Sequence, residues 1–388
     1  MNTPLKSMAL CSLLALLSGC GPERRLQLKL EDQVVEIQAL LTGQVQSAAH
    51  ATGIDQADIT RAASALRGDQ FEDPSLSRIS RDFGRSKIQV PSALVRSPVA
   101  ESGIKPWSSW WFPKFEGTLF SAPGGLSPLE KLDLYRDAHF KARRPEGTGA
   151  VSFEVRKHDP RALAWEGMCN AWSLASILAP EPRLPRSFQI GKREITFSVG
   201  DQKALLLKTF EGLSDQEVQV YGQKFTGSHE GWVHPDIFPD HFHRFIEVQL
   251  FEKKLPFIMD HDAGVEIWNV PVYKANYSMG PVEGMPHAIQ VRMWLYSATS
   301  TQKSEIDYVG TKETMREYHY ILFGEPAPDG RLEIHSGIWI KGSNGIDSRK
   351  NHPDYFLTAN ESALAARQSF NPYIHADVVD RIIRGEAP

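Results

Sequence analysis

The sequence has few cysteines and no excess of charge of either sign. Its 388 residues include three cysteines, 43 basic and 47 acidic residues, and the formal net charge is −4. A nucleic-acid-binding chain of this size is expected to carry a basic stripe, and none is visible, so nucleic acid is not an expected partner. With 41% hydrophobic and 23% charged residues, the chain is typical of a globular protein of one or two domains.

The apolar run at the N-terminus is too short to cross a bilayer as a helix. Residues 8–17 (MALCSLLALL) follow a positively charged start, which is the pattern of a secretory signal peptide. The next residues, 17–20 (LSGC), resemble the lipobox of bacterial lipoproteins, in which the chain is cut before the cysteine and the thiol is acylated. The resemblance predicts a signal peptide at residues 1–19 and lipidation at Cys20. Gly21, where an aspartate would favour retention in the inner membrane, favours the outer membrane of a Gram-negative cell.

These features predict an exported protein that is lipid-anchored to the bacterial cell envelope. The membrane would be a partner through Cys20, because each buried acyl CH₂ group contributes about 0.8 kcal/mol to binding. An ordinary secretory signal with a chance cysteine is the alternative.

One thiol remains for chemistry in the exported protein. Cys11 leaves with the signal peptide and Cys20 carries lipid, so Cys169 has no partner for an intramolecular disulfide. Residues from Cys169 onward read as a helix that Gly167 introduces, and the positive helix N-terminus favours a thiolate and offers N–H groups to an oxyanion. The pattern G-x-C-x-A-W-S resembles the nucleophile helix of the papain superfamily. A buried structural cysteine is the alternative.

The rest of the chain divides into three parts. Residues 20–67 show helical spacings and predict a stalk or a pro-segment. Residues 68–105, rich in Ser, Arg and Pro, predict a linker or an extended wrap. Residues 106–388 predict an α+β catalytic domain, with a helix at Cys169 and a mostly antiparallel sheet. The strands are expected at 194–198, 245–250, 256–259, 265–272, 288–295, 318–323 and 332–340.

A cysteine nucleophile needs a histidine base, and the histidine needs a carboxylate or amide to hold its tautomer. His243 opens the run 245–250, and Asp260 ends the return strand 256–259. Two short antiparallel strands would bring these ends together, so His243 and Asp260 are the expected partners of Cys169.

Several rivals remain open. His241 and Asp262 lie on the same sides of their segments as the expected pair. His287 with Glu325 is a second arrangement. The run Asp260-His261-Asp262 is too short and local to predict a metal site. No cofactor is expected, and the sequence leaves metal dependence open.

The residues also resemble a family, the elicitor-type transglutaminases of oomycetes and their marine-bacterial relatives. The similarity spans roughly residues 106–357, and departures occur at Val270, where the family has Gln, and before His243, where the family has Asn-Pro-Gly. It rests on segments 107–113, 127–133, 165–172, 195–207, 267–272, 337–339 and 352–355.

The resemblance implies a papain-like core and a protein-glutamine γ-glutamyltransferase activity. Cys169 would attack a glutamine carboxamide of a donor protein or peptide, release ammonia and pass the acyl group to a primary amine or to water. Trp172, Trp268 and Asn269 are implied as possible substrate-site residues, with a packed core as the alternative. Two other functions use no additional residues: a papain-like cysteine peptidase or amidase, and a non-catalytic binding lipoprotein.

Overall fold

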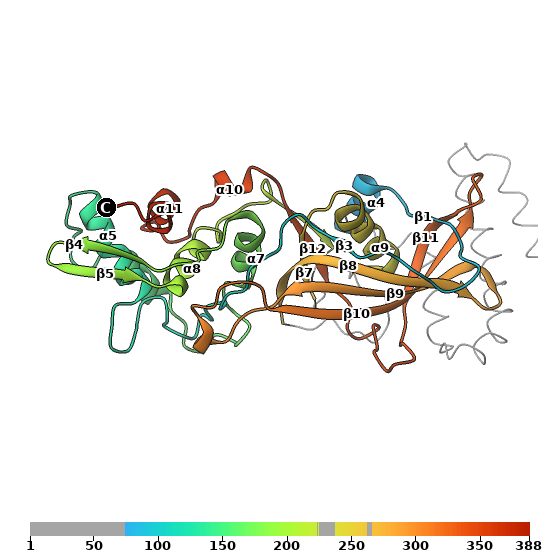
Figure 1. The fold of residues 1–388 in the computed structure, drawn as a ribbon, viewed down its shortest axis with the longest axis horizontal. Coiled ribbons are helices and arrows are strands. Elements are labelled where there is room, and N and C mark those ends of the chain that lie inside the picture. Colours follow the sequence, from blue (N-terminus) through green and yellow to red (C-terminus); the bar gives the residue numbers. More distant parts are fainter. Residues whose placement is uncertain (1–73, 223, 225–236, 262–265) are drawn as a thin grey trace, which may run out of the picture.

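The computed structural model describes residues 74–222, 224, 237–261 and 266–388. The described chain is elongated, with a helical part at one end and a large sheet at the other (Figure 1). Helix α7 (Cys169–Leu178) lies where the two parts meet. The predicted mixture of helices with a mostly antiparallel sheet is confirmed. The predicted signal peptide, Cys20 and the segment 20–67 lie outside the described residues.

Within the described residues the large sheet contains ten strands, and its strands pair antiparallel. Its long centre is the meander β8 (Asn269–Val282), β9 (Met285–Ala298) and β10 (Glu313–Pro326). The sheet continues past β10 with β11 and β1, and past β8 with β7, β12 and β6. The bounds of these strands are β11 Leu332–Trp339, β1 Lys87–Ile88, β7 Phe257–Asp260, β12 Tyr355–Ala359 and β6 Val218–Gly222.

The segment predicted as a linker or wrap lies along the large sheet. It contains helix α4 (Pro74–Phe83) and strands β1, β2 (Val95–Arg96) and β3 (Ala100–Glu101). Strands β2 and β3 pair with β8 beyond the residues of β8 that β7 covers. The folded body therefore begins before residue 106.

Five predicted strands match β5 (Arg193–Phe197), β7, β9, β10 and β11, and a sixth overlaps the start of β8. The strand predicted at 245–250 is wrong. This segment forms the end of α9 (Pro239–Ile246) and a π-helix (Glu247–Glu252). Phe242, Phe245 and Ile246 are fully buried, and their spacing places them on one helical face against the sheet.

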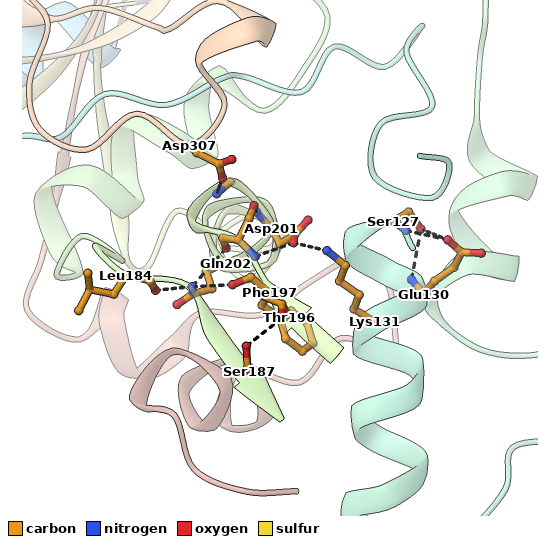
Figure 2. A network of polar contacts seen from close by, with 12 residues as sticks. Ser127, Glu130, Lys131, Leu184, Ser187, Thr196, Phe197, Asp201, Gln202 and Asp307 are labelled. Carbon is orange, nitrogen blue, oxygen red and sulfur yellow. Dashed lines mark hydrogen bonds and ion pairs between the residues drawn. The ribbon is translucent and has the colours of Figure 1, made fainter. Parts of the chain in front are cut away.

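The helical part packs α5 (Pro128–His139), α6 (Ala150–Lys157), α8 (Val199–Lys208) and α11 (Ala376–Arg384) around the hairpin of β4 (Arg186–Ile190) and β5. Two capping boxes start its helices: Ser127 with Glu130 on α5, and Ser198 with Asp201 on α8. Asp201 also forms an ion pair with Lys131, in which Nζ lies 2.6 Å from Oδ2, and this pair joins the two helices (Figure 2).

Helix α8 is anchored on two further sides. The side-chain amide of Gln202 donates to the carbonyls of Leu184 and Phe197, at the two sides of the β4–β5 hairpin (Figure 2). The backbone N–H of Gly200 donates to Asp307 at 2.7 Å. Helix α8 also packs against α7, which carries Cys169. None of the helices in the described part of the chain has the length and apolarity needed to span a bilayer.

Candidate functional site

The predicted nucleophile begins a helix, as expected. Cys169 is the first residue of α7, and 7% of it is exposed. The approach to the helix is fixed by a tryptophan, because the N–H of Met168 donates to the carbonyl of Trp111 at 2.7 Å. Gly167 passes so close that an added Cβ would lie 2.6 Å from Cδ1 of Trp111. This close approach explains the need for glycine before the helix.

Helix α7 is fastened to the start of β8. Ser173 donates through Oγ to the carbonyl of Asn269 at 2.9 Å, one turn below Cys169. The thiol of Cys169 points to the carbonyl of Ile267, with an Sγ-to-oxygen distance of 3.7 Å. The sulfur therefore lies where the chain enters β8.

Asp260 lies at the same place on the neighbouring strand. It is the last residue of β7, it is fully buried, and it is paired in register with Asn269 on β8 and Tyr355 on β12. Its Oδ1 accepts a 2.9 Å hydrogen bond from the N–H of Trp268. The structure thus brings four residues selected from the sequence together: Cys169, Asp260, Trp268 and Asn269.

The pKa of the Cys169 thiol is raised, against the expectation of an ionised nucleophile. Burial is the largest cause, and the negative charge of Asp260 acts in the same direction. The backbone N–H groups of Asn269 and Asn170 lower the pKa; each acts less than burial and more than the charge of Asp260. The charged group that acts most on this sulfur is a carboxylate, where the sequence predicted an imidazole.

Tyr355 is a site residue that the sequence interpretation did not select. Burial and the charges of Asp260 and Cys169 raise its pKa, while a hydrogen bond with the Asn269 side chain opposes this. Tyr355 therefore shares one microenvironment with all three residues. The sequence feature that could have identified Tyr355 is the segment 352–355, which was used only as part of the family resemblance.

His243 lies elsewhere in the molecule. Its Nδ1 is 2.8 Å from the hydroxyl of Tyr320, its Nε2 is 3.5 Å from Glu247, and its ring packs on Tyr277. Tyr277 is eight residues further along β8 than Asn269, which corresponds to roughly 25 Å of strand. His243 therefore does not reach Cys169, because α9 replaces the strand that would have carried it there.

The rival residues do not reach Cys169 either. His287 is exposed at the β8–β9 turn, and Glu325 lies near the end of β10, both at the far end of the sheet from Asn269. His241 is held by Ser80 on α4 at 3.0 Å. Asp262 lies outside the described residues.

His261 directly follows Asp260, and it makes a weak base. Burial, together with the nearby charge of Arg316, lowers the pKa of His261 to about 3. Within the described ranges, no group of three or more His, Cys, Asp or Glu residues could hold a metal ion.

The tryptophans divide between core and rim. Trp172 is 1% exposed and its Nε1 donates to the carbonyl of Trp107 at 2.9 Å, so the expectation that Trp172 contacts substrate is not met. Trp111 and Trp268 are half-buried, and their rings meet edge to face at 5.7 Å. Their backbones flank Cys169, because the carbonyl of Trp111 accepts from the N–H of Met168, and Trp268 follows Ile267, whose carbonyl faces the sulfur. These two rings form the apolar rim of the site.

A buried lysine holds the segment that leads to Trp111. Lys203 on α8 is fully buried, and its Nζ donates to Glu181 at 2.8 Å and to the carbonyl of Ser108 at 2.6 Å. The ammonium also lies 4.9 Å from the ring centre of Trp107. The segment that carries Trp107 and Trp111 is therefore tied to α8.

Two comparisons with known proteins relate this chain to the transglutaminases, and a third finds no match. Residues 160–285, which include Cys169, Asp260, Trp268 and Asn269, match the sequence model of the transglutaminase elicitor family. The crystal structure of the GP42 transglutaminase from Phytophthora sojae superposes with a TM-score of 0.55 at 19% identity, over 82% of this chain and 98% of that chain. No curated protein matches the chain. The fold is thus that of GP42, and the expected resemblance is confirmed.

Proposed function

Starting from this resemblance to the elicitor-type transglutaminases, we propose that the chain transfers the acyl group of a protein glutamine to a primary amine through a thioester on Cys169. The observation that carries the proposal is the position of Cys169, in the first turn of α7 and beside Asp260, at a rim of two half-buried tryptophans. This arrangement supports nucleophilic attack by sulfur on a bound carbonyl.

In the first step the sulfur forms a bond to the carboxamide carbon, and the carbon–nitrogen bond breaks. The thiol proton leaves with the amide nitrogen, and the product is ammonia. Asp260 is the carboxylate whose charge acts on the sulfur, so we assign it the transfer of this proton. The N–H groups in the first turn of α7 are the donors available to the oxyanion.

In the second step an amine attacks the thioester. The new carbon–nitrogen bond replaces the carbon–sulfur bond, and the sulfur regains a proton from the amine. Water in place of the amine would yield glutamate. Trp111 and Trp268 would favour the amine, because apolar rings limit the access of water.

The test uses the full-length chain in detergent micelles with a glutamine-rich protein and a labelled primary amine. Wild type would be compared with Cys169→Ala, and with Cys20→Ala as the matched control for loss of a thiol. We expect label and ammonia from wild type and Cys20→Ala and neither from Cys169→Ala. Ammonia without label would mean hydrolysis of the thioester, and label from Cys169→Ala would refute the proposal.

We also propose that the protein is anchored to the cell envelope through lipid on Cys20. This rests on the lipobox-like residues 17–20 and on Gly21. Mass spectrometry of the N-terminal peptide tests it. The substitution Cys20→Ala should move the protein from the membrane fraction to the soluble fraction, and fractionation of cells that express the variant measures this.

A further inference from the structure

The side chain of Asn269 carries an unused hydrogen-bond acceptor. Asn269 is the first residue of β8, and 4% of it is exposed. Its Oδ1 atom is closed to solvent, and no donor among the described residues forms a hydrogen bond with it. A buried carbonyl oxygen that lacks a donor costs about 1–3 kcal/mol, and a ligand that donates to the oxygen removes this cost.

The nitrogen end of the same amide is occupied. Burial raises the pKa of Tyr355, and a hydrogen bond from the side chain of Asn269 opposes this rise. An amide side chain has its donors on nitrogen and its acceptor on oxygen, so Nδ2 faces the phenol of Tyr355. This contact sets the orientation of the amide and leaves Oδ1 as the atom that a ligand can meet.

The register of the sheet places Asn269 on the face that α7 covers. Asn269 is paired with Asp260 on β7, and Asp260 lies two residues after Ile258. Ile258 packs in one hydrophobic cluster with Trp172 of α7. Side chains alternate along a strand and paired residues share a face, so the side chains of Asp260 and Asn269 lie on the α7 side.

Two contacts hold this part of the chain at the sulfur. Ser173 donates through Oγ to the carbonyl of Asn269 at 2.9 Å, and Sγ of Cys169 lies 3.7 Å from the carbonyl of Ile267. Cys169 and Ser173 are four residues apart, so they share one face of α7. The cysteine is only 7% exposed, so the opening that admits a glutamine side chain to the sulfur serves Asn269 as well.

We propose that Oδ1 of Asn269 binds the reacting nitrogen, first the carboxamide nitrogen that leaves and then the amine nitrogen that attacks. The inference rests on the proposed function and names the residue that selects its nitrogen. An –NH₂ group offers two N–H donors. Asn269 and Asp260 are cross-strand neighbours, with Cα atoms about 4.5–5.5 Å apart, so their side chains supply two acceptors that can flank one nitrogen.

The same oxygen disfavours groups that cannot donate to it. The carboxylate of glutamate and a γ-ester both place oxygen where glutamine places N–H, and either would leave Oδ1 buried and unpaired. Asn269 accepts a hydrogen bond and takes up no proton, so the bonds made and broken remain those of the proposed reaction, and the thiol proton still leaves with ammonia. Asn269 is thus a specificity-determining residue.

The test measures acylation of the full-length chain by a peptide with one glutamine and by its γ-methyl ester, which has no N–H at this position. Ammonia and methanol release report the two rates. Asn269→Leu should lower kcat/KM about tenfold more for the amide than for the ester, which corresponds to roughly 1.4 kcal/mol for one hydrogen bond. Equal losses for both substrates would overturn the inference.

Asn276→Leu is the matched control. Asn276 also lies on β8, its Oδ1 is likewise buried without a donor from the described residues, and it is seven residues from Asn269, or roughly 23 Å of strand. We expect this variant to keep the wild-type ratio of the two rates. A fall in the ratio equal to that of Asn269→Leu would mean that the loss is not specific to the site, and would overturn the inference.

Binding to the Cys169→Ala chain separates the inference from the folding of the variant and from the proposed function. We expect calorimetry to show about tenfold tighter binding of the glutamine peptide than of the ester. Acyl transfer by wild type together with equal binding of both peptides would reject the role of Asn269 alone. Tighter binding of the glutamine peptide without acyl transfer by wild type would support the nitrogen site and refute the proposed function.

Discussion

The carboxylate of Asp260 lies next to the thiol of Cys169, and its charge opposes ionisation of that thiol. The two residues come from elements far apart in the sequence, the first turn of α7 and the end of β7. In a thiolate–imidazolium pair the neighbour of the sulfur is a cation. Here the neighbour is an anion, and burial together with this charge raises the pKa of the Cys169 thiol.

Asp260→Asn should therefore have opposite effects on two rates. Removing the negative charge lowers the pKa of Cys169, so alkylation by iodoacetamide at a fixed neutral pH should become several-fold faster. Acyl transfer should fall, because the proton acceptor is lost. Asparagine can still accept from the N–H of Trp268, so the loop geometry is kept. Slower alkylation would contradict this, because it would mean that Asp260 supports ionisation of the thiol, as the acid of a Cys–His–Asp triad does.

The alkylation rate of wild type should rise with pH beyond the range of an ordinary thiol. Burial raises the pKa of Cys169 above its usual value of 9.0, so the thiolate fraction at pH 7 is small. The dependence of the rate on pH is measured by quenching the alkylation at set times and quantifying the modified Cys169 peptide by mass spectrometry. A plateau reached below pH 8 would contradict the expected direction.

His243 should act on acid stability and leave thiol reactivity unchanged. Burial raises the pKa of Glu247, but His243, Ser86 and Arg244 together lower it from 4.5 to about 2. A depressed carboxyl pKa contributes stability that is present above pH 4.5 and lost as the pH falls to about 2, up to roughly 3 kcal/mol.

The measurement is urea unfolding of wild type and His243→Gln between pH 6 and pH 2. We expect the variant to be less stable at pH 6 and to lose less stability on acidification. Its alkylation rate at Cys169 should match that of wild type wherever it is folded. A large fall in this rate would contradict the separation of His243 from the sulfur.

Lys203 should be one of the most sensitive positions in the helical part. Lys203→Met leaves Glu181 buried without its cation, and loss of one partner of a buried pair costs about 3–5 kcal/mol. Replacing both partners, Lys203→Met with Glu181→Leu, should recover part of this loss. Guanidinium unfolding of the single and double variants measures it, and additive losses would contradict the pairing.

Gly167→Ala should displace Trp111 and reduce acyl transfer without unfolding the chain. The new methyl group would meet Cδ1 of Trp111 at 2.6 Å and its carbonyl at 2.9 Å. Gly103→Ala is the matched control, because an added Cβ there meets no atom within 4 Å. Tryptophan fluorescence and the labelled-amine assay report the two effects, and normal activity in Gly167→Ala would argue against a fixed rim.

The helix that begins at Cys169 could be predicted from the sequence because its signals are local. One unassigned thiol, an entry glycine and a run of helix formers suffice to place Cys169. The strand ending at Asp260 was equally local, as a short apolar run ended by a carboxylate. The position of α7 against β8, fixed by Ser173, depends on long-range packing that no local pattern contains.

The assignment of His243 failed for a physical reason. Residues 242–250 are rich in aromatic and branched residues, which favour a strand, but the burial of Phe242, Phe245 and Ile246 follows helical spacing. Short apolar runs often fit both periods, and tertiary packing decides between them. Tyr355 was missed because a partner on a third strand, β12, becomes a neighbour of Asp260 only after the sheet forms.

Strands β2 and β3 take over the pairing of β8 where β7 stops, so they cap an otherwise open edge. An uncovered edge of a long strand is a template for association with other chains. Pro98 stands between the two short strands and cannot donate a backbone hydrogen bond, which makes the new outer edge a poor template. A truncated chain that begins at residue 106 would lack β2 and β3, and we expect it to aggregate through the exposed edge of β8.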